Sequence, residues 1–82
     1  MIVINMENEL LEELARKIAQ SENRRYILDE IKWFLEGHYT KCRFLALLIT
    51  NGLYREEYYK LSEELNDRNL LLKLYKLIQE KS

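Results

Sequence analysis

The sequence predicts a mainly α-helical protein that opens with one short β-strand. The apolar residues alternate with a period of two over residues 1–6 and then change to a helical period. Proline is absent, and the only glycines are Gly37 and Gly52, so few positions interrupt a helix. With 82 residues, 48% of them apolar and 33% charged, the chain has the size and balance of one small globular domain.

The strand is predicted by alternation, which puts Ile2, Ile4 and Met6 on one face and Met1, Val3 and Asn5 on the other. No later segment alternates in the same way, so the strand has no obvious partner within the chain. A buried strand must pair its backbone groups. We therefore expect the same segment of a second chain to pair with it, as a two-stranded antiparallel ribbon across a twofold axis.

Two amphipathic helices are predicted after the strand. Residues 7–18 carry apolar side chains at steps of three and four, with glutamates in the first turns and Arg16 and Lys17 near the end, as the helix dipole favours. The pattern repeats over residues 24–35. Ser21 or Asn23 is a suitable N-cap for this second helix, and Gly37 is a natural stop.

This order, carried by IVINMENELLEELARKIA and NRRYILDEIKWFL, resembles the ribbon-helix-helix DNA-binding family of the Arc and MetJ repressors and of CopG-like regulators. The resemblance covers about the first half of the chain. It implies a homodimer that binds double-stranded DNA, with strand residues reading bases and the start of the second helix holding phosphate. By position, base readout falls to Met1, Val3 and Asn5, and phosphate binding to Asn23, Arg24 and Arg25. The dimer core becomes Ile2, Ile4, Leu10, Leu14, Ile27, Ile31 and Phe34.

The chain departs from the family pattern at two positions. Members usually have a basic residue near the end of the strand and often a proline just after it, where this chain has Asn5 and Glu7. Asparagine can read adenine through two hydrogen bonds. The net charge of −1 disfavours strong nonspecific DNA binding, and Arg24 can alternatively pair with Glu22 or Asp29 on the surface.

About three further helices are predicted in residues 38–82, which extend the ribbon-helix-helix core of residues 1–37 within a single structural domain. Thr40 can cap a helix that ends at Asn51 and Gly52 and is apolar nearly all round. We therefore expect it to be buried on more than one side, either at the centre of the folded unit or within a dimer interface. Helices over residues 53–65 and 68–78 follow. Residues 53–82, from Leu53 to Ser82, either complete the dimer core or dock a partner protein.

The leading functional prediction is a homodimeric, sequence-specific transcriptional repressor. An antitoxin that binds a toxin through its C-terminal helices is one alternative, and a purely helical protein-interaction module without DNA binding is another. No enzyme motif, cofactor or metal-ligand set is recognisable, and Cys42 is expected to be a buried reduced thiol. The absence of a signal pattern or a membrane-length apolar run predicts a cytoplasmic protein with no membrane partner.

Overall fold

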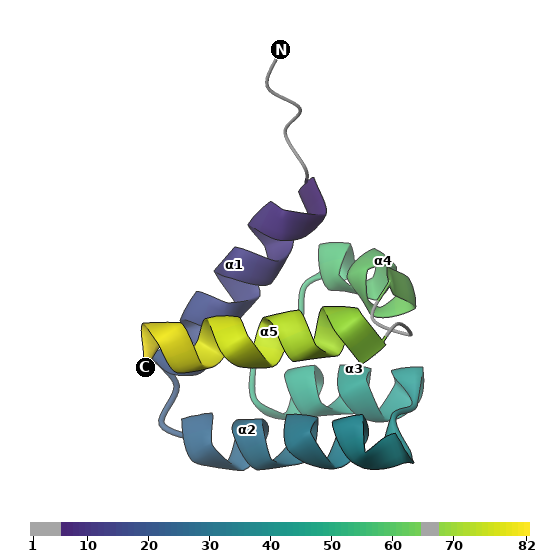
Figure 1. The fold of residues 1–82 in the computed structure, drawn as a ribbon. Helices are drawn as coiled ribbons and strands as arrows, with labels where there is room; N and C mark the ends of the chain where they lie inside the picture. Colours follow the sequence, from purple (N-terminus) through teal and green to yellow (C-terminus); the bar gives the residue numbers. More distant parts are fainter. Residues whose placement is uncertain (1–5, 65–67) are drawn as a thin grey trace.

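A computed structural model describes residues 6–64 and 68–82 of the chain (Figure 1). The helices are α1 (Met6–Ala19), α2 (Arg24–Trp33), α3 (Lys41–Thr50), α4 (Glu56–Glu64) and α5 (Arg68–Lys81), and a π-helical turn, η1 (Phe34–His38), continues α2. The described residues contain no strand, and the prediction of a mainly α-helical protein is confirmed. Residues 1–5 of the strand predicted for residues 1–6 lie outside the described residues.

Helix α1 begins one residue earlier than the sequence pattern predicts. The alternation predicts Met6 in the strand, but Met6 is the first residue of the helix, so this prediction is wrong. Methionine has a high helix propensity, and Met6 stands four residues before Leu10, which is the spacing of the helical stripe. The helical period therefore extends back to Met6.

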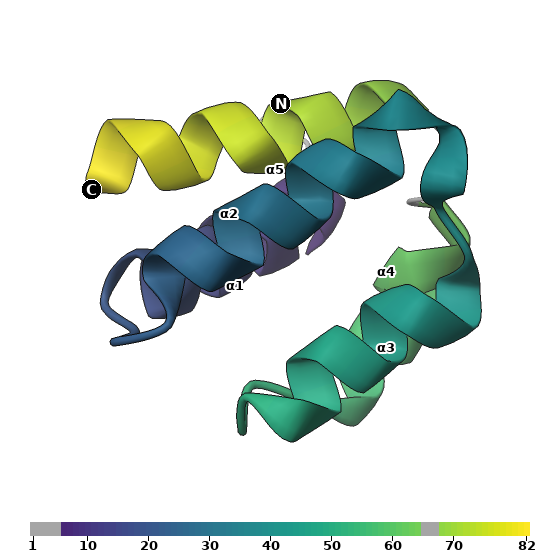
Figure 2. The same ribbon diagram turned by 90° about the horizontal axis from the view of Figure 1, so that it is seen from below.

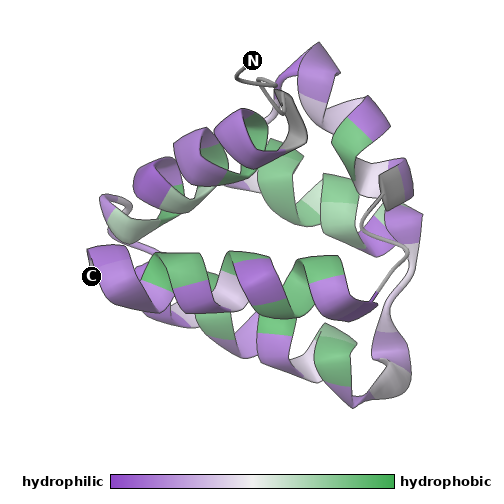
Figure 3. Cartoon of the chain, turned by 45° about the horizontal axis from the view of Figure 1, so that its top comes forward, coloured by the Kyte–Doolittle hydropathy of each residue, from purple (hydrophilic) through white to green (hydrophobic). Residues whose placement is uncertain are grey.

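Helices α1 and α5 form the main packing pair of the fold (Figure 1). Leu11, Leu14 and Ile18 are fully buried in α1, and Leu74 and Ile78 are fully buried in α5. Colouring by hydropathy shows the apolar faces of the helices turned inward (Figure 3). Both helices thus bury the apolar stripe that their sequences predict.

Gly37 ends the continuous helix formed by α2 and η1. Its φ angle is +110°, in the region that glycine adopts without the steric cost of a side chain. The predicted stop is therefore confirmed. At the other end Asn23 occupies the N-cap position of α2, but its side chain makes no capping bond.

Helices α3 and α4 form a second packing pair, which Figure 2 shows diverging from α2 beyond the Gly37 turn. Thr40 caps α3 as predicted, because its Oγ1 accepts a hydrogen bond of 3.1 Å from the Arg43 backbone N–H. The chain turns at Gly52, whose φ is +69°, and the Leu53 N–H then donates to the Leu48 carbonyl. This turn delays α4 to Glu56, later than the predicted start at residue 53.

The core is shared between the two halves of the chain. Leu14, Ile27, Ile31 and Phe34, predicted for a dimer core, are buried within a single chain, and Leu10 is partly buried against them. The same cluster includes Tyr58 and Leu61 from α4. Tyr58 is fully buried, whereas its neighbour Tyr59 is 48% exposed. Ile2 and Ile4 lie outside the described residues.

A charged cluster ties α1 to α4. Glu13 accepts a hydrogen bond of 2.5 Å from the Arg55 guanidinium and one of 3.2 Å from the Tyr58 hydroxyl, and Arg55 also pairs with Glu57. Lys17 lies 3.8 Å from Glu13. The buried phenol of Tyr58 is thereby satisfied, as a buried polar group must be.

Candidate interaction surface

Helix α3 is covered on only one side. Phe44, Leu47 and Leu48 face the core and are buried or nearly so. The other apolar positions are Cys42, Leu45, Ala46 and Ile49, which we call the α3 stripe. They follow the i, i+3, i+4, i+7 spacing that places side chains on one helix face.

The α3 stripe is open to solvent in this chain. Ile49 is 58% exposed, Cys42 and Ala46 are exposed, and Leu45 is half-buried without packing against the core cluster. The prediction that Cys42 is buried is therefore wrong for the single chain. The predicted place of α3 at the centre of the folded unit is also wrong, whereas its predicted place in a dimer interface stays a prediction. The reason is geometric, since α4 and the core reach α3 from one direction only.

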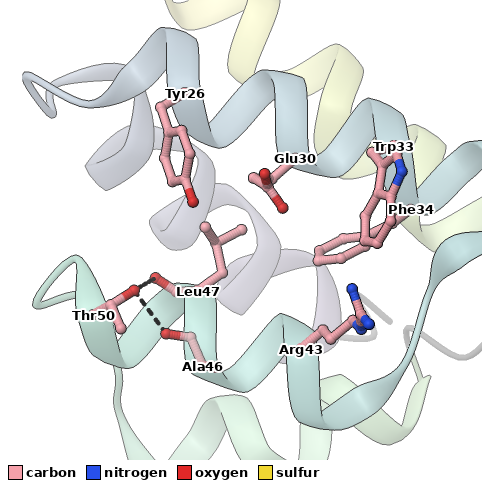
Figure 4. A pocket seen from close by; sticks show the side chains of 8 residues that line it. All are labelled: Tyr26, Glu30, Trp33, Phe34, Arg43, Ala46, Leu47 and Thr50. Carbon is pink, nitrogen blue, oxygen red and sulfur yellow. Dashed lines mark hydrogen bonds between the residues drawn. The ribbon is translucent and has the colours of Figure 1, made fainter.

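A pocket of about 250 Å³ lies beside the stripe, between α2 and α3 (Figure 4). Phe34 and Leu47 contribute apolar surface, and the 56% exposed ring of Tyr26 contributes a further wall. Ala46 belongs to both the stripe and the pocket. The complete lining is Tyr26, Glu30, Trp33, Phe34, Arg43, Ala46, Leu47 and Thr50. The stripe and pocket form one surface, which we call the α2–α3 face.

Trp33 is held in place at one end of this pocket. The imidazole of His38 stacks on its ring at a centroid distance of 4.5 Å with the planes 12° apart, and the Arg43 guanidinium lies 4.9 Å from the ring centroid. Because both neighbours restrict the indole, it can contact a partner with little further loss of side-chain freedom. Tryptophan, tyrosine and arginine are also the residues that most often dominate binding energy at protein interfaces.

The α2–α3 face carries one acid, Glu30, and one base, Arg43, whose charges are not paired within the described part of the chain. Neither the Glu30 carboxylate nor the Arg43 guanidinium makes a hydrogen bond or ion pair among residues 6–64 and 68–82. Thr50, in contrast, is satisfied internally, because its hydroxyl donates to the Ala46 and Leu47 carbonyls (Figure 4). The face is thus mainly apolar, with two opposite charges available to a partner.

The residues predicted to contact DNA are only partly visible. Met1, Val3 and Asn5 lie outside the described residues. Asn23 donates its side-chain amide to Asn51 at 2.8 Å, and an Arg24 Nη1–H donates to the Ala19 carbonyl at 3.4 Å. These two predicted phosphate ligands therefore serve as links between helix ends.

Arg24 and Arg25 do lie together at a second pocket, of about 440 Å³, at the start of α2. Its other lining residues are Leu28, Asp29, Tyr75, Gln79 and Ser82. Within the described part of the chain the Arg25 side chain makes no hydrogen bond or ion pair. The sequence pattern identified both arginines as candidate phosphate ligands. It could not show that the end of α5 lines the same pocket, because that depends on tertiary packing.

The described residues contain neither a membrane-spanning helix nor a cluster of metal ligands. No helix is both long and apolar enough to cross a membrane. No group of three or more His, Cys, Asp or Glu side chains is placed to hold a metal ion. No family model, curated protein or solved structure matches the chain.

Proposed function

We propose that this protein is a helical protein-interaction module that binds an apolar helix of a partner on its α2–α3 face. The observation that carries the proposal is the α3 stripe, in which Cys42, Ala46 and Ile49 are exposed and which adjoins the pocket at Ala46. Contiguous exposed apolar surface of this kind is characteristic of protein-binding sites. A partner helix suits it, because ridges of side chains on one helix pack into the grooves of another.

Each part of the face has a role in this proposal. The α3 stripe supplies apolar area, while Trp33 and Tyr26 supply aromatic anchors. Glu30 and Arg43 restrict which partner sequences are accepted, because a like charge placed against either one is disfavoured.

The test is selection from a displayed library of short amphipathic helices. The wild-type protein is the bait, and Ile49→Lys, at a 58% exposed position, is the counter-selection bait. We expect enriched sequences with apolar residues at i, i+3, i+4 and i+7 that bind the wild type and lose binding to the variant. If no enriched sequence binds the wild type more tightly than it binds Ile49→Lys, the proposal is contradicted.

A second candidate is the ribbon-helix-helix repressor, supported by the proximity of Arg24 and Arg25 at the start of α2. A helix start with two arginines favours a phosphate oxygen. In this reading Asn5 reads bases within a homodimer and the arginines hold the DNA backbone. An antitoxin would combine this DNA contact with a toxin-binding surface in residues 53–82.

Fluorescence anisotropy with a pool of DNA duplexes tests the second candidate. Asn5→Ala should relax the sequence preference without changing dimer stability, and Arg24→Ala should weaken binding to all sequences and reduce the salt dependence. Equal binding by the wild type and both variants excludes the DNA-binding assignment.

A further inference from the structure

We propose that the partner on the α2–α3 face is a second copy of this chain, packed through antiparallel α3 helices about a twofold axis. The inference rests on the proposed function, since it names the occupant of the same face. It does not require the predicted N-terminal ribbon, because the proposed contact is made by α3, which lies entirely within the described residues.

The first argument is the symmetry of the stripe about the middle of α3. The helix spans Lys41–Thr50, so its midpoint falls between Leu45 and Ala46. A twofold axis through that midpoint, perpendicular to the helix, places Leu45 opposite Ala46 of the partner copy. It also places Cys42 opposite Ile49 of the partner copy, because the two are equally far from the midpoint.

The second argument is size complementarity. In both of these pairings a small side chain meets a large one: alanine meets leucine, and cysteine meets isoleucine. Alternation of large and small residues across facing positions allows two helices to interdigitate without voids or clashes. In a parallel pairing, Ile49 would face Ile49 and Ala46 would face Ala46. The sequence of the α3 stripe therefore favours the antiparallel arrangement.

The third argument is charge. A surface with a single sign of charge repels its own copy, but this face carries one carboxylate, Glu30, and one guanidinium, Arg43. Neither has an ionic partner among the residues that the structure describes. In a twofold interface the same face of each copy takes part, so the Glu30 carboxylate of one copy meets a face that also carries Arg43, and the Arg43 guanidinium meets a face that also carries Glu30. The face is thus electrostatically compatible with a second copy of itself.

Sedimentation of the full chain across the micromolar range is the primary test. We expect the mass to rise with concentration from the chain mass of 10.0 kDa to twice that value. Ile49→Lys should weaken the dimer about tenfold or more, since burial of an unpaired charge costs more than the ~1.4 kcal/mol that a factor of ten represents. Glu9→Gln is the matched control, because it raises the net charge equally at an exposed position on α1.

Two further measurements identify the interface. Equimolar Cys42→Glu and Ile49→Lys chains should form a mixed dimer, since the antiparallel pairing places the new acid opposite the new base. Alkylation of Cys42 should slow as wild-type protein concentration rises, and should not slow in Ile49→Lys. Circular dichroism of each variant establishes that it is folded.

Three results overturn the inference. One is a wild-type chain that stays monomeric throughout the range, which leaves the face for a different protein if the helix library still enriches binders. Another is a dimer whose mass is insensitive to Ile49→Lys. The last is a dimer that dissociates when residues 1–4 are deleted but not in Ile49→Lys, which assigns dimerisation to the ribbon. The library experiment tests the proposed function separately in every case.

Discussion

The side-chain amide of Asn23 donates a hydrogen bond of 2.8 Å to the side-chain oxygen of Asn51 and joins the start of α2 to the end of α3. The two residues are 28 positions apart. The Asn51 amide also donates to the Leu47 carbonyl at 2.7 Å, so the bridge is anchored to α3. Together with the Gly37 turn it sets the separation of α2 and α3, and with it the pocket of the α2–α3 face.

A double-mutant cycle should detect this bridge. We expect Asn23→Ala to lower the free energy of unfolding by about 0.5–1 kcal/mol, because the bond is exposed. Asn51→Ala should cost more, since it also removes the bond to the Leu47 carbonyl. The double variant should be less destabilised than the sum of the single variants in urea denaturation. Strict additivity would show that the bridge contributes nothing.

Leu48 and Ile49 are adjacent but should respond very differently to truncation. Leu48 is fully buried, so Leu48→Ala should lower the free energy of unfolding by about 2–5 kcal/mol. Ile49 is 58% exposed, and Ile49→Ala should change the stability of the monomer by no more than about 0.5 kcal/mol. Urea denaturation at a concentration where the chain is monomeric checks both values. Equal losses would contradict the one-sided burial of α3.

Thr40 should contribute measurably to the stability of α3. Thr40→Ala removes the side-chain acceptor of the Arg43 N–H and should cost about 1 kcal/mol. Thr40→Ser keeps a hydroxyl in the same position and is the control, with most of the stability retained. The melting temperatures of the two variants are measured by circular dichroism. A lower value for Thr40→Ala than for Thr40→Ser indicates loss of the cap, whereas equal losses indicate a change in the loop.

Stability should decline at high pH through Tyr58. Burial, with the charge and hydrogen bond of Glu13, raises the pKa of Tyr58 from 10.0 to about 12. Between these values the unfolded chain releases a proton that the folded chain keeps. The stabilisation that results from this difference in pKa is therefore complete below pH 10. It is lost as pH rises towards 12, and the free energy of unfolding falls by no more than about 1.4 kcal/mol per pH unit.

Urea denaturation across this pH range checks the prediction. Tyr58→Phe is the comparison, because it has no phenol to titrate at this position and keeps most of the buried ring. We expect a steeper loss of stability with pH in the wild type than in Tyr58→Phe. Parallel pH profiles would mean that the Tyr58 hydroxyl has an ordinary pKa.

Arg25 offers the cleaner test of DNA binding at the start of α2. Arg24→Ala also removes the bond to the Ala19 carbonyl, so its effect combines stability and binding. Arg25 has no hydrogen bond or ion pair within the described residues. If the repressor candidate is correct, Arg25→Ala should weaken DNA binding and lower the salt slope by about one while leaving the melting temperature unchanged. Unchanged DNA affinity would contradict a phosphate contact there.

Local features explain how much of the fold could be predicted. The repeat of apolar residues identified the helices, and Thr40, Gly37 and Gly52 act through bonds or backbone angles within a few residues of themselves. The candidate surface was only partly predictable. The all-round apolar character of α3 indicated burial on more than one side, but the sequence does not show which side the chain itself covers.

The sequence by itself determined the helical class, the main helix ends and the core positions of Leu14, Ile27, Ile31 and Phe34, because these follow from periodicity and short-range hydrogen bonding. Only the tertiary structure decided that Cys42 is exposed, that Asn23 bonds to Asn51 and that Arg24 caps α1. The physical reason is that these contacts depend on how segments far apart in the chain pack. A local pattern can show that a helix needs a partner, but packing selects which face remains available for one.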